Sequence, residues 1–401
     1  MLNHIVKRGV AHLQAPSTQY LAKLQTDAEL YENAWRNMEF SPIETIPVLI
    51  TGAIMLLILA SIRYTLGDVV ASLAMIESPS TTAIVEQKLP AYADEEPLIP
   101  HADIDVEIIL INRKPITASL CATLRHLRRV GGFFARWRGL SISILYSFAH
   151  ALVSNILSST LGTLIFGRTL FGNTVVSILT SILLVRLHML WTHTMIAHPT
   201  TRSVLQRIVP RAQCKPLVLP TLVYVAAQQA TFLVPLGVAH LLDLSIFFDN
   251  ALLAVQQDDR TALASLALRV LAVPTTAALI ALFVLLPASA TLTRIEAVLL
   301  PADMQPIVSF DRAALVGSID LTARGSSRAL FVAAWRSFDG AARVRMLKLY
   351  AKMLGAQVAV AFVGLQIMAA EVYVIGGERL TIFFTAARAQ LELMAIEAQQ
   401  N

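Results

Sequence analysis

Six long stretches of the chain contain no Asp, Glu, Lys or Arg. They cover residues 45–62, 139–167, 169–185, 216–242, 270–293 and 353–370. A charge at the centre of a membrane span costs about 2.5 to 3.5 kcal/mol on insertion, and a helix needs about 20 apolar residues to cross the hydrocarbon layer. The pattern predicts an all-α membrane protein with six transmembrane helices arranged as three helix hairpins.

The composition supports a multi-pass protein and leaves little room for a soluble domain. Of the 401 residues, 56% are hydrophobic and 15% are charged, whereas soluble chains carry about 25% charge. Cys121 and Cys214 are too few for a disulfide framework and have no metal-ligand spacing. The sequence also contains no GxSxG, HExxH, P-loop or Rossmann glycine pattern. We therefore expect no enzymatic activity, catalytic residue, metal, cofactor or nucleic-acid partner.

The charges outside the stretches differ between the two sides of the predicted bundle. Segments 113–138 and 202–215 are basic and contain no acid, whereas segment 243–260 is acidic. The connections after the first, third and fifth spans therefore share one basic side, and both termini lie on the other. The second and third spans, separated by Arg168 alone, are predicted to form a tight hairpin.

Three segments are predicted to lie outside the six spans. Residues 1–44 are interpreted as a helical arm, lying along the membrane or solvated, through which protein partners bind. Segment 77–107 carries eight acids against the single Lys88 and four prolines, so it predicts a flexible acidic loop inserted in the transmembrane domain 45–370. Residues 371–401 are predicted to form an amphipathic tail.

A weak internal repeat appears just before two of the even-numbered spans. After Pro115, apolar residues on one helical face and arginines on the others predict an amphipathic helix, which Gly131 and Gly132 end. The segment 131–139, GGFFARWRG, then leads into the second span, and AAWRSF at 333–338 precedes the sixth. Repetition of this kind indicates a fold built from similar hairpins.

At these residues the chain resembles the mitochondrial carrier family. Each of that family's three repeats has a helix carrying PxDxxKxRxQ, a short amphipathic helix, and a second helix preceded by a DGxxxxYRG-like element. The residues that match the second element here are Gly132, Trp137, Arg138 and Gly139. The resemblance covers 46–370 and implies three hairpins of carrier type in a mitochondrial membrane.

The PxDxxKxRxQ element is matched only in part. In the third repeat Pro287, Arg294 and Glu296 take the positions of the proline, the arginine and the glutamine, and Asp68 takes that of the acid in the first. The three anchors fall at 66, 186 and 287, and the resemblance implies a kink near each of them.

The departures from the family pattern bear on mechanism. In the family, acids and lysines of these motifs form a ring of ion pairs that closes the transport path. Here the acid positions hold Asp68, His188 and Ser289, and the basic positions hold Ala71, Trp191 and Leu292. One charge cannot form such a ring, which disfavours coupled exchange between two states.

Polar groups inside the spans are further candidates for function, because they are costly in a membrane. In a carrier arrangement His150, Gln228 and Gln229 face each other, and the predicted cavity residues are His150, His188, Gln228, Gln229, Lys352 and Gln357. Hydrogen bonding between helices is the alternative explanation. Arg63 and Asp68 are offset by about 7 Å along a helix axis, so we expect no direct pair between them.

The segment around residue 139 is also predicted to contact lipid. A helix N-terminus offers free amides to phosphate, and Trp137 and Arg138 suit the headgroup layer. The predicted lipid-binding residues are Gly132, Trp137, Arg138 and Gly139, and the resemblance implies cardiolipin as the lipid. A plain aromatic belt is the alternative.

The sequence leaves three functions open. The first is a degenerate carrier acting as a scaffold, lipid-handling or protein-inserting factor, favoured by the missing gate charges. The second is an active solute transporter, favoured by Pro287, Arg294 and the in-span polar groups. The third is an unrelated six-span membrane protein.

Overall fold

The structure is a computed structural model of the chain. It describes residues 22–23, 25–27, 42–78, 80–87, 106–160, 169–203, 205–244, 260–317, 319 and 325–400. The predicted hairpin around Arg168 and nearly all of the predicted N-terminal arm lie outside the described residues. The chain divides into two compact units, described separately: 1–60 with 252–260 and 356–401, and 61–251 with 261–355.

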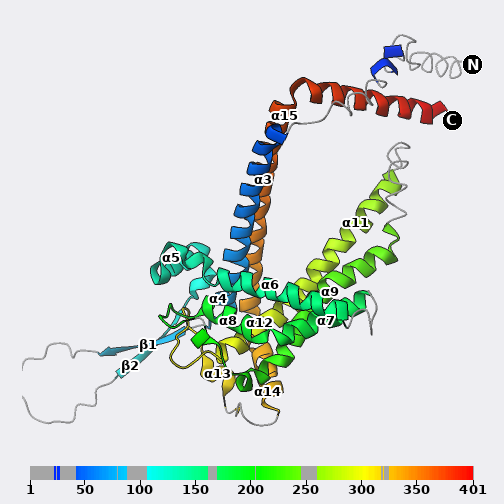
Figure 1. The fold of residues 1–401 in the computed structure, drawn as a ribbon. Coiled ribbons are helices and arrows are strands. Elements are labelled where there is room, and N and C mark those ends of the chain that lie inside the picture. The colour runs from blue at the N-terminus through cyan, green and yellow to red at the C-terminus, as the bar shows by residue number, and fades with distance from the viewer. Residues whose placement is uncertain are drawn as a thin grey trace, which may run out of the picture. The chain divides into compact units, whose positions relative to one another are not determined.

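Helices of membrane-spanning length dominate the described part of the chain (Figure 1). Among the described residues, five helical segments are long and apolar enough to cross a membrane, and a bent pair counted as one crossing makes six. The five segments are Glu44–Ile76, Phe133–Thr160, Gln213–Leu241, Ala264–Val298 and Gly340–Gly377, and the bent pair joins Leu170–Leu183 to Val185–Ile196. The prediction of a helical, multi-pass membrane protein is confirmed.

We number the spans one to six in chain order. Each odd-numbered span consists of several helical elements: α3 (Pro42–Ile62), η1 (Arg63–Val70) and α4 (Ala71–Ile76) in span one; α7 (Leu170–Leu183) and α8 (Val185–Ile196) in span three; α11 (Arg260–Ile280), η7 (Ala281–Leu285) and α12 (Leu286–Val298) in span five. The even-numbered spans contain α6 (Leu140–Leu157), α9 (Val218–Leu241) and α15 (Gly340–Gln400).

Every odd-numbered span is interrupted close to an anchor predicted from the sequence. The element η1 is a π-helix that contains Leu66. Helices α7 and α8 are bent by 62° around Leu184, beside the anchor at 186. The π-helix η7 ends just before Pro287, whose ring and missing N–H disturb regular α-helical hydrogen bonds. The interruptions therefore recur in the same part of each odd-numbered span.

Short elements connect each odd-numbered span to the even-numbered span that follows. They are η2 (Ile116–Ala118), α5 (Leu120–Gly131) and η3 (Phe133–Trp137); η5 (Leu205–Arg207) and η6 (Arg211–Leu217); and α13 (Arg312–Val316) and α14 (Ser326–Ser337). Helix α5 confirms the amphipathic helix expected after Pro115, because it buries Thr123 and Leu127 and ends at Gly132 with a φ of 72°.

The structure differs from the predicted acidic loop at both ends of that segment. Strand β1 (Ser80–Gln87) pairs antiparallel with β2 (Val106–Arg113), with Ser80 opposite Arg113 and Gln87 opposite Val106. Both strand sequences are rich in β-branched residues, which favour strands and outweigh the acidic composition. The expectation of one flexible segment over 77–107 is therefore wrong for the residues in these two strands.

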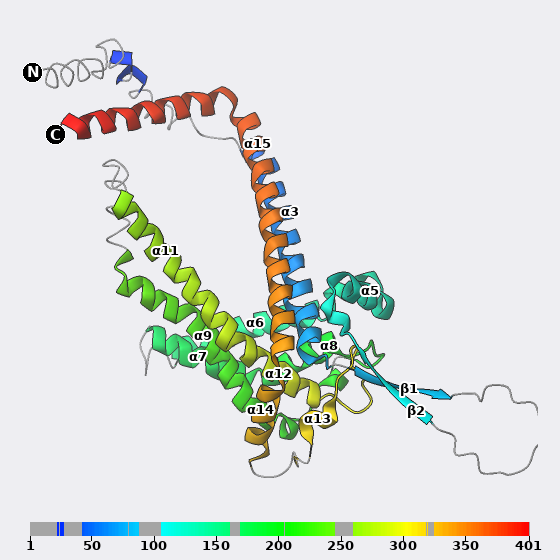
Figure 2. The same ribbon diagram turned by 180° about the vertical axis from the view of Figure 1, so that it is seen from behind.

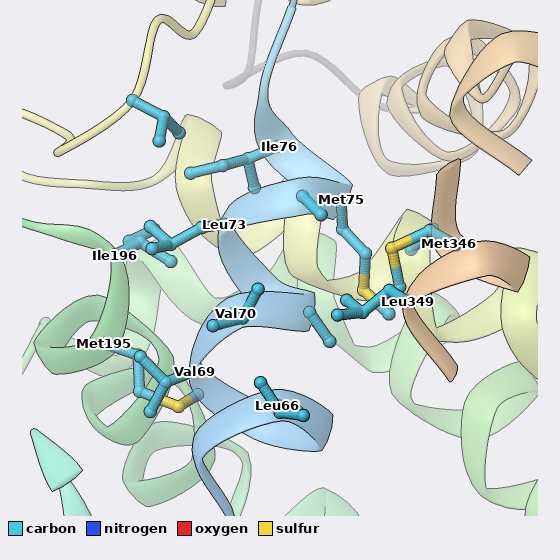
Figure 3. Packing of buried hydrophobic residues seen from close by; sticks show 14 of the residues in the cluster. Leu66, Val69, Val70, Leu73, Met75, Ile76, Met195, Ile196, Met346 and Leu349 are labelled. Carbon is cyan, nitrogen blue, oxygen red and sulfur yellow. The ribbon is translucent and has the colours of Figure 1, made fainter. Parts of the chain in front are cut away.

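The buried core of the larger unit lies where the odd-numbered spans come together. Helix α4 contacts α8 and α12, which also contact each other. Figure 3 shows apolar side chains of η1 and α4 packed against α8 and the start of α15; the labelled residues are Leu66, Val69, Val70, Leu73, Met75, Ile76, Met195, Ile196, Met346 and Leu349. We call the elements η1–α4, α8 and α12, covering 63–76, 185–196 and 286–298, the convergent end.

The smaller unit contains a closely packed helix pair. Helices α3 and α15 lie side by side (Figure 2). Met55 lies against Gly364, where a Cβ would come within 2.4 Å of its sulfur. Thr51 Oγ1 donates a 2.6 Å hydrogen bond to Glu371 Oε1. Beyond the predicted end of the span at 370, α15 remains helical except at Gly377, whose φ is 44°.

Candidate functional site at the convergent end

Two arginines hold the C-terminal end of span one. Arg294 on α12 is 6% exposed, and its Nε donates a 2.7 Å hydrogen bond to the carbonyl of Met75. Arg345 on α15 donates from Nη2 to the carbonyls of Ala74 and Glu77, at 3.2 and 3.1 Å. The last carbonyls of a helix have no partner within the helix, so these arginines satisfy them from spans five and six.

The other odd-numbered spans end in the same way. Arg138, just before α6, donates from Nε to the carbonyl of Thr194 at 2.9 Å and from Nη2 to that of Ala197. Arg312 donates from Nη1 to the carbonyl of Leu300, just beyond α12, at 3.3 Å. An arginine from another element therefore caps the C-terminal end of every odd-numbered span.

One acid–histidine pair joins two of these spans inside the convergent end. His188 Nδ1 on α8 lies 2.7 Å from Glu296 Oε1 on α12, and Glu296 is fully buried. The carbonyl of Glu296 also accepts a 2.8 Å hydrogen bond from His193 Nε2. The other carboxylate oxygen, Glu296 Oε2, is buried and has no hydrogen-bond partner in the part of the chain that the structure describes. Among the described residues, the Glu296 carboxylate therefore has His188 as its hydrogen-bond partner.

Aromatic rings from three spans surround His188. The ring centroids of Tyr146, Trp191 and Tyr224 lie 5.5, 5.6 and 6.3 Å from that of His188. Trp191 Nε1 donates to Tyr64 Oη at 3.2 Å, and the Tyr64 hydroxyl donates to the carbonyl of Arg138 at 2.8 Å. The ring shell therefore connects the His188–Glu296 pair to the arginine cap of span three.

Asp68 lies on η1 beside this pair and is partly exposed. Its charge acts on His188, and that of Arg63 acts on Asp68. Arg63 and Asp68, which are both described, form no ion pair with each other.

The predicted lipid-binding residues lie at the junction between α5 and α6. Gly139 precedes α6 with a φ of 78°, and Trp137 Nε1 donates to Ser61 Oγ at 2.9 Å. Arg138 instead turns inward to the end of α8, a role that the sequence did not indicate. Arg136 is half-buried here, and its guanidinium lies 4.3 Å from the Phe133 ring centroid.

The predicted cavity residues do not contact one another in the described structure. His150 Nε2 lies 3.2 Å from Ser181 Oγ, and Gln229 Nε2 donates to Ser177 Oγ at 3.2 Å, so both contact α7. Gln228 donates to Tyr224 Oη on its own helix at 2.8 Å. Lys352 is exposed on α15, and Gln357, also on α15, belongs to the smaller unit. The contacts of His150 and Gln229 are the interhelical hydrogen bonds given as the alternative.

The carrier-motif residues have separate environments. Pro287, Arg294 and Glu296 are buried on α12, whereas Asp68 lies on η1. Sequence reasoning missed Arg345 and Arg312 as caps, and it treated Glu296 only as the counterpart of a glutamine. Glu296 follows the predicted span 270–293 by three residues, so the charge-free pattern did not mark it as a buried acid that needs a partner, although His188 was already a candidate.

A hollow of about 490 Å³ lies at the end of α4 and is lined by residues of α4, α12, α13 and α15. Three cations and three acids line it: Lys114, Arg294, Arg345, Glu77, Asp311 and Asp339. Each acid accepts a main-chain N–H, as Glu77 does from Ile116 at 2.6 Å and from Thr117 at 2.9 Å. The lining charges balance, so the hollow is not an anion site on charge alone.

No family model, curated protein or solved structure matches the chain. Within the described residues, no three His, Cys, Asp or Glu side chains lie together so as to hold a metal ion. At the convergent end, arginine side chains hydrogen-bond the ends of the odd-numbered spans, and one acid–histidine pair joins spans three and five.

Proposed function

We propose that this chain is a divergent carrier-type membrane protein that acts as a scaffold, lipid-handling or protein-inserting factor rather than as an exchanger. The order of its elements supports the carrier resemblance, since an interrupted span, short connecting helices and a second span occur three times. Helix α6 contacts α7, α7 contacts α9, and α9 contacts η7 and α12, so successive spans pack side by side.

The observation that carries this proposal is the way the convergent end is closed. Arg138, Arg294, Arg312 and Arg345 bind main-chain carbonyls, and apolar side chains fill the space between the spans. An exchanger needs contacts that break and re-form between two states of similar energy. Main-chain caps leave buried carbonyls unsatisfied when they break, which costs about 1–3 kcal/mol each. Such a closure favours one permanent state.

The test is reconstitution of the full chain into liposomes. We expect no saturable counter-exchange of labelled nucleotides or carboxylates above protein-free liposomes, and finding it would overturn the proposal. In the same liposomes, leaflet-to-leaflet movement of a labelled phospholipid would indicate lipid handling, and insertion of a tail-anchored test segment would indicate protein insertion. A scaffold would show neither activity.

The alternative, an active solute transporter, is favoured by the His188–Glu296 pair, because an inter-span pair of this kind can act as a gate. It predicts that counter-exchange occurs and is lost in both His188→Gln and Glu296→Gln. Loss of exchange in only one of the two variants would argue against a gate formed by the pair.

We also propose a lipid contact at the α5–α6 junction and a mitochondrial location. Phe133 and Phe134 are 50% and 74% exposed beside Arg136, at the start of the second span. Exposed aromatic rings and an arginine suit an anionic headgroup layer. Cardiolipin should raise the Tm of the purified chain more than phosphatidylcholine does, and Arg136→Ala should reduce the difference. The location rests on the carrier resemblance, and fractionation of cells expressing a tagged chain tests it.

A further inference from the structure

We propose that His188 is an intramembrane proton-binding site, with Glu296 as its buried counter-charge, and that proton uptake tightens the convergent end. This inference goes beyond the proposed function, since it holds for a scaffold as well as for a transporter. It rests on the geometry of the pair, on the groups that face it, and on the spans that it joins.

The geometry determines which nitrogen takes the proton. Nδ1 of His188 lies 2.7 Å from Glu296 Oε1, so an ionised Glu296 requires a hydrogen on Nδ1. Nε2 is then the free base of the neutral ring, and the His188 side chain is 18% exposed. Nε2 takes a proton from hydronium and releases water, while the Nδ1 hydrogen stays with Glu296.

Each charged or titratable group that faces His188 is either an acid, which favours the protonated ring, or an uncharged aromatic side chain. Two acids act on it, Glu296 from α12 and Asp68 from η1. The neutral hydroxyl-bearing rings of Tyr146 and Tyr224 come from α6 and α9, and Trp191 adds a third ring from α8 itself. Aromatic faces attract cations. The nearby arginines interact with other groups. Arg138 donates a hydrogen bond to the end of α8, and the charge of Arg63 acts on Asp68.

The carboxylate makes the pair sensitive to the charge of His188. Glu296 is fully buried, and among the described residues no donor reaches its Oε2, so within this part of the chain its charge is balanced through Oε1. A buried charge that loses its counter-charge is strongly destabilising. Because His188 and Glu296 lie on α8 and α12, the protonation state of one side chain acts directly on the contact between spans three and five.

The sign of the pH dependence follows from linkage. The folded protein places the imidazolium beside a buried carboxylate, whereas the unfolded chain does not, so folding favours the protonated form. The stabilisation is present at low pH and is lost as pH rises through the titration of His188. The test measures thermal unfolding of the full chain in detergent from about pH 8 to about pH 5.5, the range in which histidine titrates.

We expect the Tm of the native chain to rise by roughly 2–4 °C as pH falls through this range, and the rise to be absent in His188→Gln and Glu296→Gln. The matched control is His150→Gln, because His150 contacts serines and no acid. A full rise in folded His188→Gln, or loss of the rise in His150→Gln, would overturn the proposal.

A milder variant covers the case in which His188→Gln does not fold. Asp68 is partly exposed and has no hydrogen-bond partner among the described side chains, so Asp68→Asn should fold. Removing one of the two facing acids weakens the preference of the folded protein for the protonated ring, so it should move the midpoint of the rise in Tm to lower pH and make the rise smaller. An unchanged midpoint in Asp68→Asn would contradict the assignment of His188 as the titrating group.

Discussion

The four arginines that cap the odd-numbered spans donate hydrogen bonds to main-chain carbonyls, and none of them forms an ion pair with an acid among the described residues. Arg294 and Arg345 bind the end of α4, Arg138 binds the end of α8, and Arg312 binds the end of α12. Sequence alone could not predict these bonds, because an arginine beside a span suits a headgroup layer and a helix cap equally well. Only the packing of distant elements brings each guanidinium to its carbonyl.

Replacing Arg294 by Ala should therefore destabilise the fold through span one. The variant leaves the Met75 carbonyl without its partner in a buried site, a loss of about 1–3 kcal/mol. Chemical unfolding in detergent measures the change. The control is Arg343→Ala, an exposed arginine whose guanidinium lies 5.7 Å from the Phe338 ring, which should cost less than about 0.5 kcal/mol. Equal stability of the two variants would contradict the cap.

Two glycines with positive φ allow backbone strain to be separated from packing. Gly325→Ala should cost about 1–2 kcal/mol, because the left-handed backbone disfavours a Cβ, and no atom lies within 4 Å of the new methyl group. Gly139→Ala has the same backbone cost and also places its Cβ 3.2 Å from Trp191 Cδ1. The second variant should unfold at lower denaturant concentration than the first, and the reverse order would show that the Trp191 contact relaxes freely.

At the scale of elements, the charge-free stretches predicted the spans well and their ends poorly. The odd-numbered spans are interrupted around Leu66, at Leu184 and just before Pro287, and each interruption lies close to an anchor. The anchors could be found in the sequence because each is a proline or another motif position. The continuation of α15 beyond 370 was not predicted, since Glu371 ends the charge-free run. The hydrogen bond from Thr51 gives this acid a partner that only the packing of α3 on α15 supplies.

The α3–α15 pair should be sensitive to the size of the residue at position 364. Gly364→Ala places a methyl group 2.4 Å from Met55 Sδ, so α3 must shift or Met55 must change rotamer, at a cost of about 1–3 kcal/mol. On the same helix, no atom lies within 4 Å of the position that a Cβ would take at Gly355, and Gly355→Ala should stabilise the helix by about 0.5–1 kcal/mol. Unfolding measurements on both variants should therefore give opposite signs, and destabilisation by both would argue against close packing as the cause.

For the molecule as a whole, hydropathy and loop charge predict how many spans cross the membrane and in which orientation. The contacts between side chains of different spans depend instead on how the spans pack. The six charge-free stretches correspond to five long helices and one bent pair among the described residues. The acid and base positions of the carrier-like motifs hold one charge, Asp68, because Glu296 takes the position of a glutamine. Its pairing with His188 depends on α8 meeting α12, a contact between segments far apart in the chain.

The predicted orientation can be tested with the cysteines of the chain. Cys121 is exposed on α5, within the first basic connection, and Cys214 is buried before α9. In sealed vesicles of known orientation, an impermeant maleimide should label Cys121 only from the basic side and leave Cys214 unlabelled until denaturant is added. A Cys121→Ser chain carrying Thr385→Cys, at an exposed position of the tail, should be labelled only from the opposite side, because six crossings place the tail across the membrane from the basic connections. Labelling of both positions from one side would mean that the bent pair of α7 and α8 does not cross, which would leave five spans.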